Sequence, residues 1–226
     1  MAAPTLHLFD RFEGRLGILP TVGAVTHTEE LGGEDTIEFD CPMAPEKGDR
    51  LVWLDPEDGV WREHEVVRTD EPLGMPAHVY AESSVCECLR DFIEEAQLVS
   101  RTAEQAMAAA LAPTRWALGT VDMGDAKRGC LLYHTNALAA LRRVEEVWGG
   151  ELECSVSVEG GRVSSRTVSL PARRGRWRGA RFSYGKNMAA CTRTVLEDEV
   201  FTALYGFGRG LAIVGEDGEA TGGFTR

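Results

Sequence analysis

The sequence predicts a mixed α+β fold, and three observations support this class. Short segments with strand patterns fill residues 5–81 and are separated by turns that contain glycine or proline. Helical periodicity then alternates with strand patterns over residues 102–170, and strand patterns return after Pro171. These changes divide the chain into three predicted parts: an N-terminal β domain over 1–98, an inserted α/β domain over 99–170, and the start of a second β-rich domain over 171–226.

The first domain is predicted from strand alternation. Ile37 and Phe39 fall on one face of Thr36–Phe39 and polar residues on the other, as in a half-buried strand. Gly32-Gly33 predicts a hairpin between this strand and Ala24–Glu29. The other predicted strands are Thr5–Phe9, Arg50–Leu54, Val60–Arg68 and Ala77–Ala81, with turns at Glu13–Gly17, Asp55–Gly59 and Pro72–Pro76. Short strands at this spacing favour a small barrel or a sandwich.

Two helices are predicted from capping and periodicity in the second domain. Thr102 and Gln105 form a capping-box pattern for an alanine-rich helix that Pro113 ends. Thr135 is the predicted cap of a second helix, which ends at Gly149-Gly150. The apolar stripe of that helix consists of Leu138, Leu141, Val144 and Trp148.

The other elements of this domain are a short helix, a strand and a hairpin. A short helix is predicted at Ser83–Ile93 and a strand at Trp116–Val121. Glu159-Gly160-Gly161 predicts a hairpin that joins Glu151–Val158 to Arg162–Leu170. Helix, strand, helix and hairpin together predict a compact α/β unit.

The last part of the chain is predicted to contain strands at Arg181–Tyr184, Cys191–Leu196 and Val200–Tyr205, followed by a glycine-rich turn over Gly215–Gly223. The final strand has no obvious partner in the sequence. We therefore expect the second β-rich domain to be incomplete and the chain to be truncated.

The composition is that of an ordinary globular protein. Lys plus Arg total 24 against 36 for Asp plus Glu, so a formal net charge of -12 argues against general or specific nucleic-acid binding. Met1–Leu8 has neither a basic nor an apolar signal region, which predicts neither secretion nor a membrane anchor. The six cysteines are therefore expected to be reduced thiols that mostly fill the core.

Several stretches together resemble the N-terminal region of phage minor structural proteins, the family also called prophage tail endopeptidase or tail-associated lysin. Each stretch is short, but their order and their spread from residue 5 to residue 210 make the combination specific. They are Leu6–Asp10, Leu16–Pro20, Glu29–Phe39, Lys47–Arg50, Tyr80–Ser84, Thr102–Ala106, Trp148–Leu152 and Thr202–Gly208.

This resemblance implies a baseplate hub with two β-barrel-like domains and an α/β domain inserted between them, the second barrel being incomplete here. It implies a homotrimer that extends the tail tube at the virion tail tip after assembly in the bacterial cytoplasm. The implied partners are other copies of the chain and neighbouring tail proteins such as distal tail and tape-measure components. Any peptidoglycan endopeptidase activity is expected in a C-terminal extension, so the chain itself is not expected to be an enzyme.

The residues provide weak support for catalysis, metal binding or a cofactor, and none of these is predicted. Cys86-Glu87-Cys88 beside His78 lacks the spacing and the second cysteine pair of structural zinc sites. His7, His27 and His64 fall in strand-like segments, where we expect polar surface roles. The paired acids Glu29-Glu30, Glu94-Glu95 and Glu145-Glu146 point apart along a strand or helix, which favours solvated faces over glycosidase chemistry.

An arginine-rich segment departs most from the acidic background of the chain. It comprises Arg173, Arg174, Arg176, Trp177, Arg178 and Arg181. Guanidinium groups pair well with carboxylates, so these residues are the candidate subunit-contact patch, and an exposed loop without a partner is the alternative. Trp177 leaves open a third function, a receptor- or sugar-binding module, because the other four tryptophans are expected to be buried.

Overall fold

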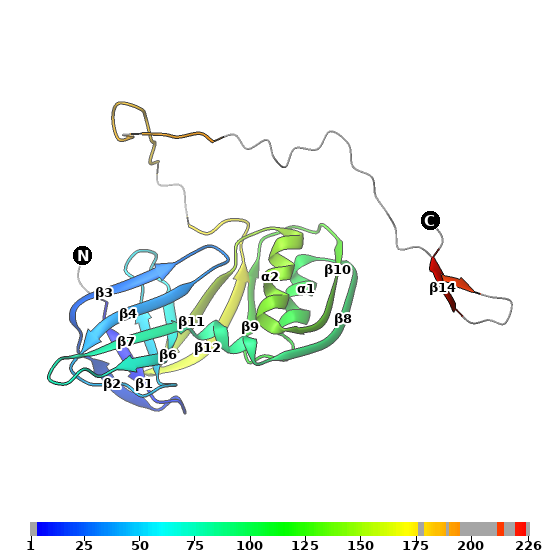
Figure 1. Cartoon of the computed structure of the whole chain (residues 1–226). Helices are drawn as coiled ribbons and strands as arrows, with labels where there is room; N and C mark the ends of the chain where they lie inside the picture. The colour runs from blue at the N-terminus through cyan, green and yellow to red at the C-terminus, as the bar shows by residue number, and fades with distance from the viewer. Residues whose placement is uncertain (1–3, 176–178, 189, 195–211, 215–219, 225–226) are drawn as a thin grey trace. The chain divides into compact units, whose positions relative to one another are not determined.

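The structure is a computed structural model that describes residues 4–175, 179–188, 190–194, 212–214 and 220–224. The chain divides into two compact units, Met1–Arg176 and Trp177–Arg226, which are described separately (Figure 1). None of the described helices is both long and apolar enough to cross a membrane. The fold is rich in strands, which confirms the predicted β-rich α+β class at this coarser level.

A seven-stranded antiparallel sheet forms the first part of the larger unit. Its strands are β1 (Leu6–Phe9), β2 (Arg15–Leu19), β3 (Val22–Glu29), β4 (Asp35–Cys41), β5 (Arg50–Leu54), β6 (Trp61–Asp70) and β7 (Ala77–Ser83). Their order across the sheet is β2-β1-β5-β6-β7-β4-β3. Most of these strands were predicted, but β2 was not, because its outward positions carry Leu16 and Ile18.

The connection between β2 and β3 shows why this sheet is curved. These strands lie at opposite edges, which in a flat seven-stranded sheet would be roughly 29 Å apart. Only Pro20 and Thr21 separate Leu19 from Val22, a path of at most about 11 Å. The two edges must therefore approach each other at this point, and the sheet curls into an open half-barrel (Figure 1).

The inner face of the half-barrel is apolar because alternate residues of each strand point inward. Ile37, Phe39 and Cys41 of β4 face Leu51 and Trp53 of β5 in this core. The other buried members are Leu6, Leu8, Leu19, Val66, Val79 and Ala81. Part of the outer face is covered by a hairpin from later in the chain, whose Val156 packs against Phe9 and Val52.

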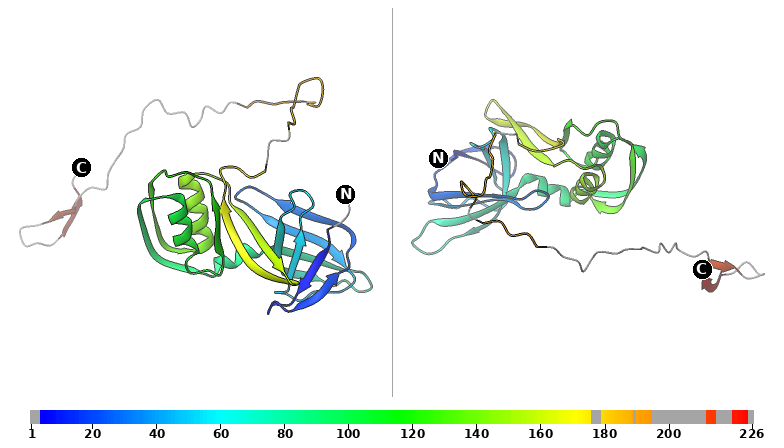
Figure 2. Two further views of the ribbon diagram at one scale, coloured as in Figure 1. Left: turned by 180° about the vertical axis from the view of Figure 1, so that it is seen from behind. Right: turned by 90° about the horizontal axis from the view of Figure 1, so that it is seen from above.

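The α/β part follows β7 through a short 3-10 helix, η1 (Ser84–Leu89). Its other elements are β8 (Phe92–Arg101), α1 (Ala103–Leu111), β9 (Ala117–Val121), β10 (Arg128–Asn136), α2 (Ala137–Trp148), β11 (Glu153–Glu159) and β12 (Arg162–Leu170). Antiparallel β8 and β10 form one sheet, and β11-β12-β9 form another in which β12 and β9 run parallel. The two helices lie between these sheets (Figures 1 and 2).

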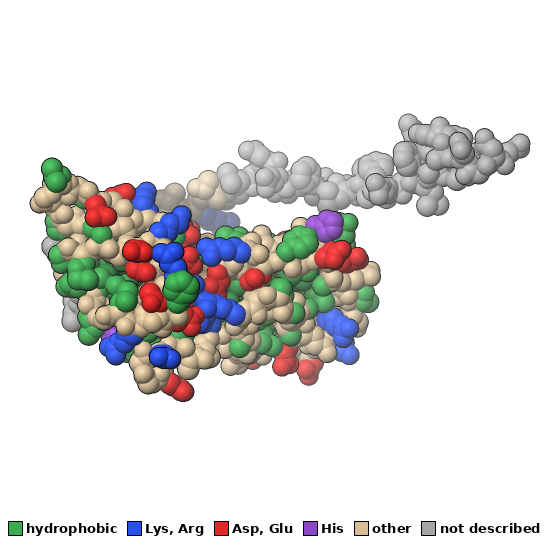
Figure 3. Space-filling model, turned by 90° about the horizontal axis from the view of Figure 1, so that it is seen from below, with side chains coloured by type: hydrophobic (Ala, Val, Ile, Leu, Met, Phe, Trp, Pro, Cys, Tyr) green, Lys and Arg blue, Asp and Glu red, His purple; other side chains and the backbone are tan. Residues whose placement is uncertain are grey.

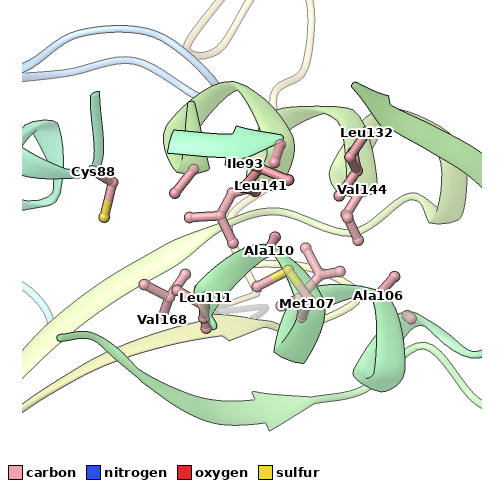
Figure 4. Close-up of a cluster of buried hydrophobic side chains, with 14 of the residues drawn as sticks. Cys88, Ile93, Ala106, Met107, Ala110, Leu111, Leu132, Leu141, Val144 and Val168 are labelled. Carbon is pink, nitrogen blue, oxygen red and sulfur yellow. The ribbon is translucent and has the colours of Figure 1, made fainter. Parts of the chain in front are cut away.

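The core of this part is built from both helices and both sheets. Met107 and Ala110 of α1 pack with Leu141 and Val144 of α2 (Figure 4). Ile93, Leu132 and Val168 close this core from the strands, and Trp148 donates its indole N–H to the carbonyl oxygen of Arg101 at 3.2 Å. The predicted apolar stripe of α2 is confirmed, with Leu141, Val144 and Trp148 buried and Leu138 packed against them.

The sequence placed some boundaries of this part wrongly. The predicted helix over Ser83–Ile93 ends at Leu89, and β8 begins at Phe92. The buried residues of β8, Ile93 and Leu98, are five positions apart, so the strand shows no simple alternation. The N-terminal cap of α2 is Asn136 instead of Thr135. The predicted division of the chain at residue 98, which lies within β8, stays a prediction.

The described residues of the second unit form a turn and a hairpin. The predicted strand Arg181–Tyr184 is not formed: residues 181–183 are irregular, and Tyr184 makes an isolated bridge with Met188 around a turn at 185–187. Asn187 accepts a hydrogen bond from the Ser183 N–H and donates one to the Arg181 carbonyl. β13 (Ala212–Val214) pairs with β14 (Ala220–Phe224). The predicted strand Cys191–Leu196 is absent at 191–194, and Val200–Tyr205 lies outside the described residues.

Candidate functional site

One end of the half-barrel is closed by polar side chains. On three strands the inward-facing apolar row finishes with a polar residue: His27 follows Val25, Asp35 precedes Ile37, and His64 precedes Val66. Strand alternation therefore places His27, Asp35 and His64 inside the sheet at the same end. The expectation that His27 and His64 are surface residues is wrong, since His64 is fully buried and His27 partly buried.

Asp35 joins the two imidazoles by hydrogen bonds. Its Oδ1 atom lies 2.9 Å from Nε2 of His27 and 3.0 Å from Nε2 of His64. Trp53 donates its indole N–H to Nδ1 of His64 at 3.2 Å. Because Nδ1 accepts this bond, the proton of neutral His64 lies on Nε2, which donates to Asp35. We call His27, Asp35, Trp53 and His64 the polar cluster.

The polar cluster has the composition of a metal site, but its hydrogen bonds do not favour one. The ligand atoms of His27, Asp35 and His64 all lie within 4.8 Å of one another. A metal ion on Nε2 of His64 would move the ring proton to Nδ1, where it would face the N–H of Trp53. Metal-bound histidines normally donate this second N–H to an acceptor. Two N–H donors that face each other disfavour a bound metal ion. We therefore interpret the polar cluster as a hydrogen-bonded group that stabilises this end of the half-barrel.

The electrostatics of Asp35 agree with this role. Burial alone would raise the pKa of Asp35, but hydrogen bonds from His27, His64 and Ser83 lower it far below the usual range. The carboxylate is thus ionised at neutral pH, and it accepts hydrogen bonds instead of acting as a general acid.

Arg62 balances the acidic residues at the same end. It contacts Asp55 at 2.9 Å, Asp58 at 2.7 Å and Glu29 at 3.1 Å. Burial alone would lower the pKa of Arg62, but the surrounding carboxylates raise it. Asp55 and Asp58 lie in the turn predicted before β6, and each accepts a backbone N–H there. The acids of this turn are therefore used within the fold.

The opposite end of the half-barrel exposes apolar side chains. β4 runs from Asp35 to Cys41, so Met43 lies just beyond its far end, and the β6–β7 hairpin extends in the same direction. Thr69 donates to the carbonyl oxygen of Pro45 at 2.9 Å, which ties the two loops together. We define the apolar end as Phe12, Leu16, Met43, Leu73 and Met75, whose exposed fractions are 85%, 58%, 54%, 103% and 70%. Apolar residues gathered this way often mark interaction surfaces.

Ion pairs join the half-barrel to the α/β part. Arg166 of β12 pairs with Glu63 of β6, and Arg50 of β5 pairs with Glu87 of η1 at 3.2 Å. Arg115 also contacts Glu87, at 2.7 Å. Figure 3, which views the molecule of Figure 1 from below, shows acidic and basic side chains gathered across the middle of that face. A buried carboxylate without its arginine would be strongly unfavourable, and these partners lie on different elements. The ion pairs therefore fix the orientation of the two parts.

The structure places only part of the predicted arginine patch. Arg173 is exposed, whereas Arg174 pairs with Glu29 through its guanidinium and donates its backbone N–H to Glu151. Arg181 is exposed in the second unit. The remaining members, Arg176, Trp177 and Arg178, lie outside the described residues. The subunit-contact role of this patch stays a prediction. Arg174 already binds Glu29 and Glu151 of its own unit.

The cysteine and histidine residues weighed from the sequence do not form a catalytic group. The thiol pKa is raised to about 11 for Cys86 and to about 12 for Cys88, and the main cause in both is burial. Both thiols are therefore protonated at neutral pH and are poor nucleophiles. His78 instead bonds to Asp40 at 2.9 Å. Within the described residues, the group with metal-ligand geometry contains neither these cysteines nor His78.

The paired acids have ordinary structural surroundings. Glu29 bonds to two arginines, and Glu146 pairs with Arg143. Glu145 accepts the backbone N–H of Leu152 at 3.0 Å. Glu94 and Glu95 are exposed on β8, as expected for a solvated face.

Comparison with known families matches the α/β part of the chain. Residues 90–163 match a family model described as the prophage endopeptidase tail domain. The match begins just before β8 and ends within β12, so it includes both helices. These residues are therefore similar to that domain. The resemblance inferred from the sequence is thereby confirmed, although the family description shows no catalytic activity for this chain.

The fold is also similar to that of a solved prophage tail protein. Prophage tail protein gp18 from Listeria monocytogenes EGD-e matches with a TM-score of 0.55 at 12% sequence identity. The match covers 74% of this chain and 50% of gp18, so the chain spans about half the length of that protein. At this identity the likeness shows a shared fold. No curated protein matches the chain. The match to the prophage endopeptidase tail domain, which agrees with the resemblance seen in the sequence, supports a phage tail protein.

Proposed function

We propose that the chain is a structural subunit of a phage or prophage tail tip, a baseplate-hub protein that assembles into a ring and closes the distal tail tube. The observation that carries this proposal is the open half-barrel, whose edge strands β2 and β3 pair with no second strand on their outer sides among the described strands. A row of unpaired N–H and C=O groups is a template for pairing with another chain.

The two edges differ in chemistry, as a ring requires. A threefold ring needs two different patches on each copy that meet head to tail. β2 exposes Leu16 and Ile18, whereas β3 exposes Thr26, Thr28 and Glu29. Unlike edges on one half-barrel support a closed trimer. In this proposal the ring sits at the virion tail tip and supports host attachment or cell-wall penetration, next to distal tail and tape-measure proteins.

A measurement of mass in solution tests the proposal. Sedimentation velocity on the full chain over a range of concentrations should give a trimer. Ile18→Lys places a charge on the β2 edge and should weaken assembly, because edge lysines block strand pairing. Leu54→Lys is the matched control, since Leu54 is also an exposed apolar residue but lies on β5, which pairs with both β1 and β6. A monomer at the highest soluble concentration, or equal effects of both variants, would count against ring assembly.

The arginine patch is tested separately. Arg173→Glu should weaken self-association if this exposed arginine contacts a carboxylate of another copy. Arg174→Glu is a poorer probe, because it would place two carboxylates together at Glu29. Arg143→Glu reverses an exposed charge on α2 and serves as the control. Unchanged assembly of Arg173→Glu would remove this residue from the proposed contact.

The second candidate function is a tail-associated peptidoglycan endopeptidase whose catalytic part lies C-terminal to these residues. Two observations favour keeping it: the family description names an endopeptidase, and the chain spans half of gp18. Zymography on cell walls distinguishes the two functions. Lysis by the purified chain would place the activity within these residues, where the protonated thiols of Cys86 and Cys88 offer no ready nucleophile.

A further inference from the structure

The apolar end of the half-barrel forms a groove with an apolar floor. Leu8 and Leu19 of the inner core form this floor, and Phe12, Leu16 and Met43 form its rim. The β6–β7 hairpin, which carries Leu73 and Met75, is tied to the groove residue Pro45 by the hydrogen bond from Thr69. Full exposure of side chains this large is unfavourable in water, so the groove has the properties of a binding surface.

The charges around the groove are mainly acidic. The carboxylates of Asp10, Glu46 and Asp49 line the groove, against the cation of Arg11. Arg11 is paired with Glu46 at 3.0 Å, which leaves Asp10 and Asp49 as the charged residues of the lining outside this ion pair. A partner that combines apolar side chains with positive charge would therefore fit this surface best.

Residues 179–188 of the chain have this complementary chemistry. They contain Arg181 and Lys186 and no acidic residue, although the whole chain has a formal net charge of -12. Phe182 and Tyr184 are 73% and 84% exposed on the turn that Asn187 holds. Aromatic residues with arginine are the side chains that most often dominate binding at protein interfaces.

We infer that the segment 179–188 of one copy docks into the groove at the apolar end of a second copy. This contact uses two different surfaces of the same chain, which is the head-to-tail arrangement that a ring needs. Phe182 and Tyr184 bury against Phe12, Leu16 and Met43, while Arg181 and Lys186 face the acidic rim. The inference rests on the proposed function, because it names a surface through which copies of the chain assemble.

Binding of a labelled peptide tests this contact directly. A fluorescent peptide of residues 179–188 is titrated with the full chain and followed by anisotropy. Saturable binding is expected, and Phe12→Ser with Met43→Ser in the chain should weaken it at least about tenfold, the scale of interface hot spots. Both side chains are exposed, so these substitutions leave the core intact. Leu131→Ser, at a similar exposed apolar residue of β10, should leave binding unchanged.

Peptide variants separate the aromatic contribution from simple charge attraction. A peptide with Phe182→Ala and Tyr184→Ala keeps both cations and should also bind at least about tenfold more weakly. Absence of binding, equal binding by a scrambled peptide, or equal binding by the groove variant would each overturn the inference.

Failure of the inference can be told apart from failure of the proposed function. A chain that forms a trimer but does not bind the peptide retains the ring function and loses this contact. A chain that binds the peptide specifically and forms dimers or open oligomers, but no trimer, retains the contact and loses the ring. A chain that binds the peptide but stays monomeric loses both.

Discussion

Arg166 of β12 donates two hydrogen bonds to Glu63 of β6, at 2.6 Å and 2.7 Å, and both side chains are buried. The two residues are 103 positions apart in the sequence, so this pair joins the α/β part to the half-barrel. Arg166 also contacts Glu13 at 2.9 Å, and Arg50 lies 3.7 Å from Glu63. This network therefore holds the two parts of the larger unit together.

Loss of one partner from this pair should destabilise the chain strongly. Arg166→Met leaves the fully buried carboxylate of Glu63 without its bidentate partner and should lower the free energy of unfolding by roughly 3–5 kcal/mol. The double variant Arg166→Met with Glu63→Leu removes both charges and should be less destabilised than the single one. Urea unfolding measures both. A double variant as unstable as the sum of the two single variants would show that the residues act independently.

Zinc should not stabilise the native chain through the polar cluster. The indole N–H of Trp53 occupies Nδ1 of His64, so the Nε2 atom keeps its proton and has no lone pair for a metal ion. Thermal unfolding with and without added Zn²⁺ should therefore give the same Tm. A rise in Tm that disappears in His27→Ala would instead establish a metal site at the cluster.

Local elements of this fold were predictable from the sequence because their signals lie within a few residues. The capping box at Thr102, the apolar stripe of α2 and the glycine turn of the β11–β12 hairpin were all placed correctly. The strands of the half-barrel were found where one face is buried, as in Thr36–Phe39. Their physical causes, capping and alternation, act over short sequence distances.

The polar cluster and the ion pairs were not predicted because they depend on long-range pairing. His27 and His64 meet only when β3 and β6 curve toward each other in the half-barrel. The sequence did contain a signal for the polar cluster, because each of its polar residues ends an inward-facing apolar row of a strand. The order of the strands is needed to show that these ends lie together. β8 and β10 were missed because they pair only with each other and leave Leu131 and Tyr133 exposed.

Removal of the Thr102 cap should cost a modest amount of stability. Its hydroxyl accepts the backbone N–H of Gln105, and the Gln105 side chain accepts the backbone N–H of Thr102, both at 3.3 Å. Thr102→Ala should lower the free energy of unfolding by about 1 kcal/mol, whereas Thr102→Ser retains the acceptor and should change little. Chemical denaturation of the two variants gives the comparison. Equal losses in both would indicate that the methyl group, not the hydroxyl, provides the stability.

Stability should fall at acidic pH because of buried carboxylates. Burial opposes the shift, but hydrogen bonds from His27 and His64 lower the pKa of Asp35, and Arg115 lowers that of Glu87. Groups with a lower pKa in the folded state stabilise it above their unfolded pKa values, about 3.9 and 4.3, and lose this contribution as the pH falls further. Asp35→Asn should flatten this decline below about pH 5, while Asp125→Asn, at an exposed residue, should not. If the stability of Asp35→Asn fell with pH as steeply as that of the wild-type chain, the role of the Asp35 carboxylate in this decline would be contradicted.

Gly150 should tolerate substitution less well than Gly160, although both have positive φ angles. A Cβ atom at Gly150 would lie 2.8 Å from the sulfur of Met123 and 2.9 Å from the carbonyl oxygen of Pro171, whereas one at Gly160 would meet open space. Gly160→Ala should therefore cost only the left-handed backbone strain, about 1–2 kcal/mol. Gly150→Ala should cost about 1–3 kcal/mol more, because the backbone oxygen of Pro171 cannot move without disturbing the hydrogen bond that it accepts from the Glu151 N–H. Thermal and urea unfolding of the pair provide the test, and equal losses would mean that the Gly150 turn relaxes freely.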